Sequence, residues 1–249
     1  MTLKEFFKEN QKIAVAFSGG ADSAYLLSQA KKYADNVRAY YLNSQFQPEF
    51  ELNDALRLAD ELSAELTVID VDLSGKTDIL KNSKLRCYYC KQNMFDTLIK
   101  RANADGYYVI LDGTNASDSE EDRPGMRVLK EKNVLSPLKI CALKKEDIYC
   151  LSKKEGLFTC DKPSYSCLAT RIPEGMEITK DLLRKIERAE NLLFSLGFSD
   201  FRFRIITCDS AKLQLKREQH EKAEKTIEKI REELKDDFSE IHIDKEVFR

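Results

Sequence analysis

The amino-acid sequence predicts an α/β protein: an open parallel sheet with helices on both faces, plus a smaller α+β domain at the C-terminal end. Short apolar runs alternate with stretches in which apolar residues recur at helical spacing. Such strand–helix repeats favour parallel strands, because each crossover helix returns the chain to the same edge of the sheet. The pattern changes near Pro173, so we expect domains at 1–172 and 173–249.

A glycine turn joins the first predicted strand to the first helix. The apolar run at 13–17 ends in Ser-Gly-Gly, and apolar residues then recur at helical spacing from Ala24 to Ala30. We expect further strands at 37–42, 66–73 and 108–111, and further helices at 55–62, 95–102 and 144–154. Polar, turn-rich composition predicts a loop at 112–125 and irregular structure at 161–175.

The C-terminal part has a different order of elements. An amphipathic helix is predicted at 180–196, and Gly197 is placed to end it. Strands are expected at 201–206 and 212–215, a helix at 221–235, and a last strand around Ile241 and Ile243. This order predicts an α+β domain.

Composition limits the class of protein. The chain has 249 residues and a formal net charge of −2, so its overall electrostatic field does not attract nucleic acid strongly. No segment approaches the roughly 20 apolar residues that span a bilayer, and the N-terminus lacks a signal-peptide core. We therefore expect a cytoplasmic protein without membrane contact, in which the seven cysteines stay reduced. The two histidines, His220 and His242, lie in a charged tail, which argues against a histidine triad or zinc site.

The segment Ser18–Ser23, Ser-Gly-Gly-Ala-Asp-Ser, is predicted to bind phosphate. Gly19 and Gly20 allow the backbone to turn sharply near an anion, and the N–H groups of a new helix point at it. The hydroxyls of Ser18 and Ser23 add donors. The Gly-Lys-Ser/Thr ending of a Walker A loop is missing, and so is the three-glycine dinucleotide pattern. Asp22 beside phosphates predicts a Mg²⁺ ion, which binds carboxylate and phosphate oxygens together.

A second polar segment follows the fourth predicted strand. Asp112 and Asn115 lie just past its end, and parallel strands place such ends at one edge of the sheet. We expect both residues to contribute to the nucleotide site, with a plain Asp-Gly turn as the alternative.

Three cysteines have a spacing that suits metal or sulfur chemistry. Cys87 and Cys90 form a Cys-x-x-Cys, and Cys167 follows 77 residues after Cys90. The neighbouring Arg86 and Lys91 favour thiolate forms. Three thiolates are one too few for a closed zinc site and suit a [4Fe–4S] cluster with one open iron.

Other interpretations of the cysteines remain. The three thiols also suit persulfide or disulfide chemistry, and Cys160 as a fourth ligand would close a zinc site. Packing alone is the plainest alternative, and it is what we expect of Cys141, Cys150 and Cys208.

The Ser-Gly-Gly-x-Asp-Ser string after a first strand resembles the pyrophosphate loop of N-type ATP pyrophosphatases. These include NAD synthetase, GMP synthetase and tRNA-thiolating enzymes. The resemblance implies a pyrophosphate-loop fold that cleaves ATP between the α and β phosphates and leaves AMP on a substrate oxygen. Asp112-Gly113-Thr114-Asn115 resembles the second nucleotide segment of this superfamily.

The glycine loop and the cysteine segments together resemble the LarE family, over most of the chain. That family inserts sulfur into a pyridinium carboxylate mononucleotide during synthesis of the nickel-pincer nucleotide. The three cysteines match its three-cysteine branch, which implies an iron–sulfur cluster and an external sulfur source. The resemblance places Arg171, Arg202 and Arg204 on the substrate anion and Glu190 near the sulfur site. Independently, Arg202 and Arg204 stand two apart on one strand face, as an anion clamp would.

The sequence therefore predicts an ATP-dependent sulfur transferase that adenylates a carboxylate, releases pyrophosphate and replaces oxygen with sulfur. Its expected cofactors are ATP, Mg²⁺ and a [4Fe–4S] cluster, its substrate is a small nucleotide, and we expect a homo-oligomer. The sulfur donor stays open. The alternatives are an amidating ligase of the NAD synthetase type, a tRNA thiolase and a non-enzymatic nucleotide sensor.

Overall fold

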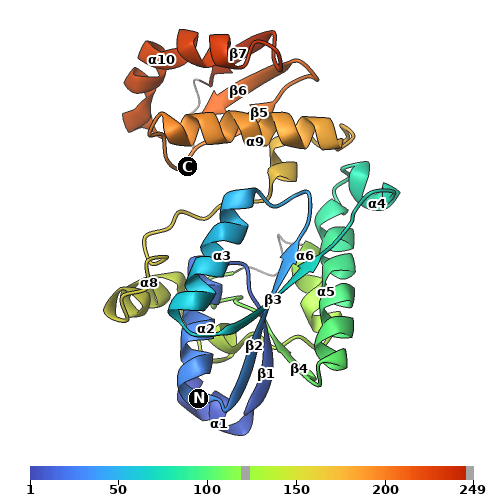
Figure 1. The fold of residues 1–249 in the computed structure, drawn as a ribbon, viewed down its shortest axis with the longest axis vertical. Coiled ribbons are helices and arrows are strands. Elements are labelled where there is room, and N and C mark those ends of the chain that lie inside the picture. The colour runs from blue at the N-terminus through green and yellow to red at the C-terminus, as the bar shows by residue number, and fades with distance from the viewer. Residues whose placement is uncertain (119–123, 245–249) are drawn as a thin grey trace. The chain divides into compact units, whose positions relative to one another are not determined.

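The computed structural model describes residues 1–118 and 124–244, and these form two compact units (Figure 1). The first unit contains Met1–Ser74 and Leu85–Ser164, and the second contains Gly75–Lys84 and the chain from Tyr165 onward. Each unit is described by itself below. The predicted division into functional domains after residue 172 stays a prediction.

The first unit is built on a four-stranded, all-parallel sheet with the order β3-β2-β1-β4. Its strands are β1 (Lys12–Ala16), β2 (Asn36–Asn43), β3 (Glu65–Asp70) and β4 (Val109–Leu111). The chain passes from β1 outward to β2 and β3, then returns to place β4 on the other side of β1. The strand order therefore reverses between β1 and β4. In open parallel sheets, ligands bind at the carboxyl ends of the strands at such a point.

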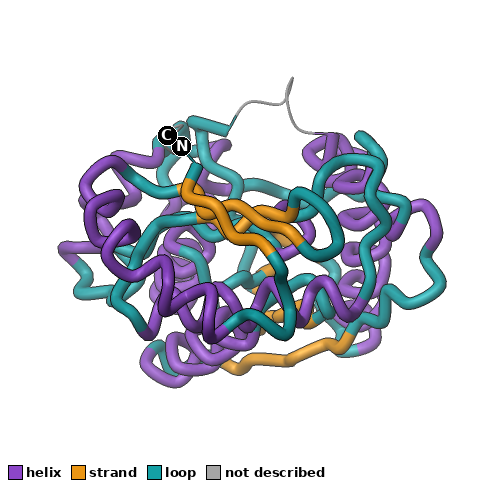
Figure 2. Tube along the Cα trace, turned by 90° about the horizontal axis from the view of Figure 1, so that it is seen from above, coloured by secondary structure: helices purple, strands orange, loops and turns teal. Residues whose placement is uncertain are grey.

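Helices cover both faces of this sheet (Figures 1 and 2). The unit contains α1 (Leu3–Glu9), α2 (Ala21–Tyr33), α3 (Glu49–Glu61), α5 (Arg86–Ala104), α6 (Pro124–Glu131), α7 (Pro137–Ile140) and α8 (Lys145–Lys154). One core cluster joins one face of the sheet to α1, α2, α3, α7 and α8, and contains Phe7, Leu26 and Leu58. A second cluster joins the opposite face to α5 and α6 through Leu98 and Val128. The two apolar faces explain why the central strands read as continuous apolar runs.

The second unit is a three-stranded mixed sheet with helices. It contains α4 (Thr77–Leu80), the 3₁₀ turn η1 (Leu168–Arg171), α9 (Lys180–Ser195), β5 (Arg202–Ile205), β6 (Ser210–Gln214), the 3₁₀ turn η2 (Arg217–Gln219), α10 (His220–Glu233) and β7 (Glu240–Ile243). β5 pairs antiparallel with β6, and β6 pairs parallel with β7 after the α10 crossover. The Thr179 hydroxyl caps α9 by accepting from the Leu182 N–H at 3.2 Å.

The predicted fold class is confirmed, and several boundaries differ. The helix expected at 95–102 begins at Arg86, because only its later turns, from Met94 onward, bury apolar residues and so show the periodic pattern. Strand β3 ends at Asp70 rather than residue 73. The expected loop at 112–125 contains the start of α6 at Pro124, and its residues 119–123 lie outside the described part. Helix α1 was not predicted, although a capping box of Thr2 and Glu5 marks its start.

Candidate functional site

The glycine loop lies where the strand order of the first sheet reverses. It connects the end of β1 to α2, whose first N–H groups have no partner inside the helix. Gly19 has φ = +72°, and a Cβ there would lie 3.1 Å from the Cβ of Ala55 on α3. Only glycine combines this conformation with so close an approach. The Ser18 and Ser23 hydroxyls lie 3.0 Å apart, and that of Ser23 also donates to the Gly20 carbonyl at 3.0 Å, so the loop is held in shape by its own side chains.

The second predicted nucleotide segment packs directly against this loop. A Cβ on Gly113 would lie 2.9 Å from the Ser23 backbone nitrogen and 3.3 Å from the carbonyl carbon of Asp22. Asp112 is buried, and its two carboxylate oxygens accept from the hydroxyls of Thr114 at 2.5 Å and Ser136 at 2.6 Å. The Asp112 side chain therefore shapes the segment, and its role in nucleotide binding stays a prediction.

Asn115 shapes the same segment. It is buried, and its side-chain oxygen accepts from the Ser117 N–H at 2.8 Å, which closes a tight turn. Asp118 accepts from the Asn115 backbone N–H at 3.0 Å. The role of Asn115 in nucleotide binding stays a prediction.

Asp22 fits a carboxylate that binds a cation. It lies in the first turn of α2, where Oδ2 accepts from Nζ of Lys145, at the start of α8, over 2.7 Å. Its Oδ1 is buried and has no hydrogen-bond partner among the described residues. A buried carboxylate oxygen without a partner is costly, and Mg²⁺ beside phosphate oxygens would satisfy it.

Cys87 and Cys90 lie near the start of α5, three residues apart and so on neighbouring positions of one helix face. Cys87 is exposed, Cys90 is half-buried, and neither forms a disulfide. Arg86 Nη2 lies 3.6 Å from the Cys87 sulfur. Two adjacent thiols on one face suit shared ligation of a cluster or exchange of sulfur between them.

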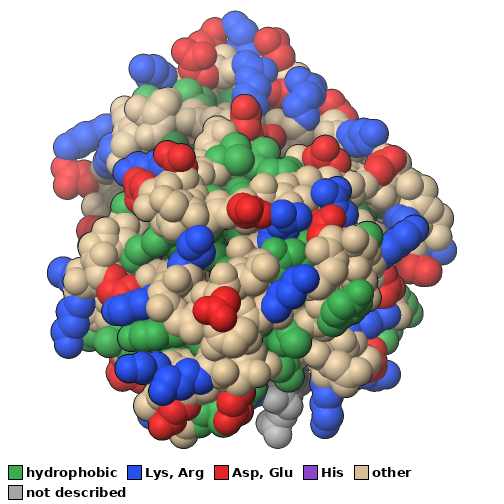
Figure 3. All heavy atoms as spheres, turned by 60° about the horizontal axis from the view of Figure 1, so that its bottom comes forward, with side chains coloured by type: hydrophobic (Ala, Val, Ile, Leu, Met, Phe, Trp, Pro, Cys, Tyr) green, Lys and Arg blue, Asp and Glu red, His purple; other side chains and the backbone are tan. Residues whose placement is uncertain are grey.

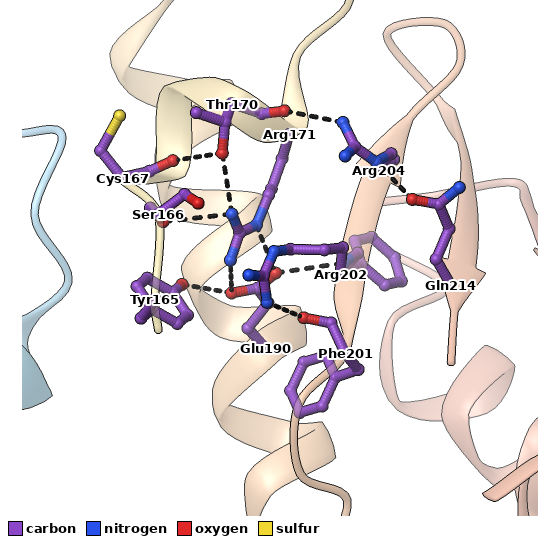
Figure 4. A network of polar contacts seen from close by, with 11 residues as sticks. Tyr165, Ser166, Cys167, Thr170, Arg171, Glu190, Phe201, Arg202, Arg204 and Gln214 are labelled. Carbon is purple, nitrogen blue, oxygen red and sulfur yellow. Dashed lines mark hydrogen bonds and ion pairs between the residues drawn. The ribbon is translucent and has the colours of Figure 1, made fainter. Parts of the chain in front are cut away.

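In the second unit, Arg171 and Glu190 form a buried, two-point ion pair (Figure 4). Arg171 Nε and Nη2 donate to Oε1 and Oε2 of Glu190 at 2.7 and 3.2 Å, and both side chains are almost fully buried. Oε1 also accepts from the Phe203 N–H at 3.0 Å, and Oε2 accepts from the Tyr165 hydroxyl. Burial, with the negative charge of Glu190, raises the pKa of Tyr165, so its hydroxyl remains a donor.

Arg202 and Arg204 extend the positive charge of this cluster along β5. Arg202 is buried and donates to the Phe201 carbonyl at 2.7 Å. Arg204 donates to the Thr170 carbonyl at 3.0 Å and to the side-chain oxygen of Gln214. Burial, followed by repulsion from Arg171, lowers the pKa of both guanidinium groups. An anion bound here would offset the burial and the repulsion that act on these two guanidinium groups.

No protein-family profile matches the chain. Pyridinium-3,5-bisthiocarboxylic acid mononucleotide synthase of Lactiplantibacillus plantarum, a LarE protein, is 32% identical over 216 residues, which are 86% of this chain and 78% of the relative.

The chain belongs to the LarE family.

Two further relatives are described only as uncharacterized proteins. One, from Methanocaldococcus jannaschii, is 37% identical over 191 residues, which cover 77% of this LarE-family chain and 72% of the relative. The other, from Synechocystis, is 33% identical over 204 residues, which cover 81% of this chain and 76% of the relative.

The structure of this LarE-family chain collects most of its predicted residues into two groups, to which Cys87 and Cys90 on α5 do not belong. Those of the two nucleotide segments lie together at the carboxyl edge of the first sheet, and Cys167, Arg171, Glu190, Arg202 and Arg204 lie together in the second unit. Within either unit, no three described His, Cys, Asp or Glu side chains gather as a metal site. The predicted meeting of Cys167 with the Cys-x-x-Cys involves both units and stays a prediction.

Sequence reasoning missed several residues of these groups. Lys145 and Ser136 follow separate turns and carry no motif, and Tyr165 lies in a segment expected to be irregular. The position of Tyr165 two residues before Cys167 was the one available signal.

Two further features of the chain are the distribution of charge on its surface and the hydrophobicity of its helices. On the face drawn in Figure 3, basic and acidic side chains are interspersed, so that face carries no large field of one sign. None of the described helices is both long and apolar enough to cross a bilayer.

Close packing of the two nucleotide segments predicts that Gly113→Ala destabilises the first unit. The new methyl group would meet backbone atoms of α2 at 2.9 Å, so the segment must move, at a cost of about 1–3 kcal/mol in the free energy of unfolding. Urea denaturation measures this. The matched control is Gly125→Ala on α6, where the closest atom, at 3.2 Å, belongs to the flexible side chain of Lys91. Equal stability of the two variants would contradict the packing described here.

Proposed function

We propose that this LarE-family chain is a sulfur-transferring enzyme that uses ATP to activate a carboxylate of a pyridinium dicarboxylate mononucleotide. The observation that carries the proposal is the contact of Gly113 with the first turn of α2, where the strand order reverses. Two backbone segments that approach so closely form a nucleotide site without bulky side chains between them. The name of the Lactiplantibacillus relative supports the substrate class.

In the first step, the N–H groups at the start of α2 would bind the phosphates of ATP, and Asp22 would hold Mg²⁺, which supplies positive charge beside them. The substrate carboxylate attacks the α phosphorus, the bond to the bridging oxygen breaks, and pyrophosphate leaves. Lys145, which donates to Asp22 in the structure, would bind the phosphates of ATP beside it. The product is an acyl adenylate, which has a good leaving group where the carboxylate had none.

The second unit supplies the charge that holds the acid substrate. Arg202 and Arg204, which stand on one face of β5, donate to its remaining carboxylate or its phosphate. Arg171 and Glu190 hold this strand to the segment that carries Cys167. Substrate binding would thus use the positive charge of Arg202 and Arg204.

In the second step, a sulfur nucleophile attacks the acyl carbon. The carbon–sulfur bond forms as the carbon–oxygen bond to AMP breaks, which leaves a thiocarboxylate and AMP and no change of oxidation state when the nucleophile is sulfide. Cys87, Cys90 and Cys167 would hold a [4Fe–4S] cluster, whose open iron supplies a site for sulfide when it is bound. Held as protein persulfides, the same thiols would need an external reductant to release the product.

The amidating ligase is the second candidate, because the first unit serves adenylation whatever nucleophile follows. The two neighbouring thiols of Cys87 and Cys90 at the start of α5 favour sulfur over ammonia, since an amidating enzyme has no use for them. Transfer of ³⁵S rather than ¹⁵N from labelled sulfide and ammonia separates the two.

ATP turnover is expected to yield AMP and pyrophosphate, and Asp22→Asn should slow it about 10²–10³-fold, since it removes one preorganised charge at the phosphates. Pyrophosphate release with the dicarboxylate nucleotide measures this. Asp181→Asn, which changes an exposed aspartate in the first turn of α9, is the matched control and should keep the wild-type rate. ADP and phosphate as the only products would exclude the proposed activation.

Replacing Arg204 by Met should lower the affinity for the acid substrate about 10- to 150-fold, because one charge-assisted hydrogen bond contributes about 1.5–3 kcal/mol to binding. ATP affinity should stay the same. Calorimetric titration of each ligand measures both, with the exposed Arg184→Met on α9 as the control. If both affinities fell equally, Arg204 would serve the fold rather than the substrate.

Serine at Cys87, Cys90 or Cys167 should abolish sulfur transfer and leave pyrophosphate release intact, because activation precedes attack by sulfur. Anaerobic assays with labelled sulfide measure the first, and coupled pyrophosphate assays measure the second. Cys141→Ser and Cys208→Ser are the controls. If Cys167 alone proved essential, it would donate its own sulfur to the substrate and no cluster would be needed. If none of the three changes affected activity, the amidating ligase would be favoured.

A further inference from the structure

Tyr165 contacts three charged groups of the second-unit cluster, although no sequence motif singles it out. Its hydroxyl donates to Oε2 of Glu190. Its ring centroid lies 4.6 Å from the guanidinium carbon of Arg171 and 6.0 Å from that of Arg202. Figure 4 shows the ring beside the Glu190 carboxylate, on the segment that leads to Cys167.

The Glu190 carboxylate is fully engaged by its donors. Two come from Arg171, one is the Phe203 N–H, and one is the Tyr165 hydroxyl. A carboxylate has about four lone-pair sites, so these four donors fill them and fix its orientation. Glu190 therefore acts as an anchor, and it accepts a proton from a substrate only if one of these bonds breaks.

The chain from Tyr165 to Arg171 is attached to this anchor at both ends, with Cys167 between them. Inside the segment, the Thr170 hydroxyl donates to the Cys167 carbonyl at 2.7 Å and accepts from Arg171 Nη1 at 2.8 Å. Arg171 Nη1 also donates to the Ser166 carbonyl at 3.1 Å. The peptide groups on both sides of Cys167 are thus held, and Figure 4 shows its sulfur pointing away from the charged cluster.

We propose that Tyr165 is a positioning residue whose hydroxyl, through Glu190, fixes the direction of the Cys167 thiol. This inference rests on the proposed sulfur transfer, in which that thiol takes part. Attack at carbon requires reacting atoms about 3–3.5 Å apart, and a misplacement of about 1 Å costs about 10²-fold in rate. Arg171 holds the Ser166 carbonyl, and the Tyr165 hydroxyl adds a second attachment, to Glu190, one residue earlier in the segment.

The test compares Tyr165→Phe with the wild type by amide hydrogen exchange and by kinetics. The variant keeps the ring beside the guanidinium groups and loses only the hydrogen bond. The Thr170 N–H, which donates to the Cys167 carbonyl, and the Phe203 N–H should exchange about tenfold faster or more, as loss of a charged hydrogen bond implies. Sulfur transfer should fall on the order of 100-fold, with pyrophosphate release unchanged.

Tyr41→Phe is the matched control. Tyr41 lies buried in the first unit, and its hydroxyl has no hydrogen-bond partner among the described residues, so this change removes a buried hydroxyl without breaking a bond. This variant should keep wild-type amide hydrogen exchange in residues 165–171 and wild-type rates of sulfur transfer and pyrophosphate release.

Three results would overturn the proposal. Unchanged exchange at Thr170 and Phe203 in Tyr165→Phe would show that the hydroxyl fixes nothing. Faster exchange throughout α10 as well would show that Tyr165 stabilises the whole unit rather than the Cys167 segment. An equal loss of pyrophosphate release would show that Tyr165 acts before the attack by sulfur. A wild-type protein that transfers no sulfur would contradict the proposed function instead, and the exchange measurement would still decide the role of Tyr165.

Discussion

The buried ion pair of Arg171 and Glu190 is the interaction on which the organisation of the second unit depends. It ties the turn after Cys167 to α9, and the Phe203 N–H ties the same carboxylate to β5. Removing one partner of such a pair typically costs about 3–5 kcal/mol, because the other charge stays buried without compensation. Three segments far apart in sequence are thereby held around one carboxylate, at the place where the predicted substrate arginines lie.

The same pair shapes the electrostatics of the cluster. Burial and repulsion from Arg171 lower the pKa of Arg202 and Arg204. Both guanidinium groups donate to backbone carbonyl oxygens of the second unit. The proposed carboxylate or phosphate ligand would add a charged acceptor, so the cost of burying these arginines would become a source of binding free energy.

In the first unit, the constraint is close approach of backbones. Gly19 meets α3 and Gly113 meets α2, and both contacts leave no room for a side chain. The carboxyl edge of the sheet therefore presents N–H groups of a helix start rather than bulky residues. The pair of Asp22 with Lys145 lies beside this edge, where it keeps a carboxylate and a lysine oriented.

The sequence by itself determined what depends on local chemistry. Apolar spacing indicated the parallel sheet and the C-terminal α+β unit, and the Ser-Gly-Gly-x-Asp-Ser string indicated the glycine turn from β1 into α2, because glycine conformation and helix starts are local properties. Tertiary structure alone decided which distant residues meet. Gly113 against Ser23, Lys145 against Asp22, and Tyr165 on Glu190 all follow from strand order and packing. No spacing in the chain encodes these contacts, since each joins elements whose separation in sequence says nothing about their distance in the fold.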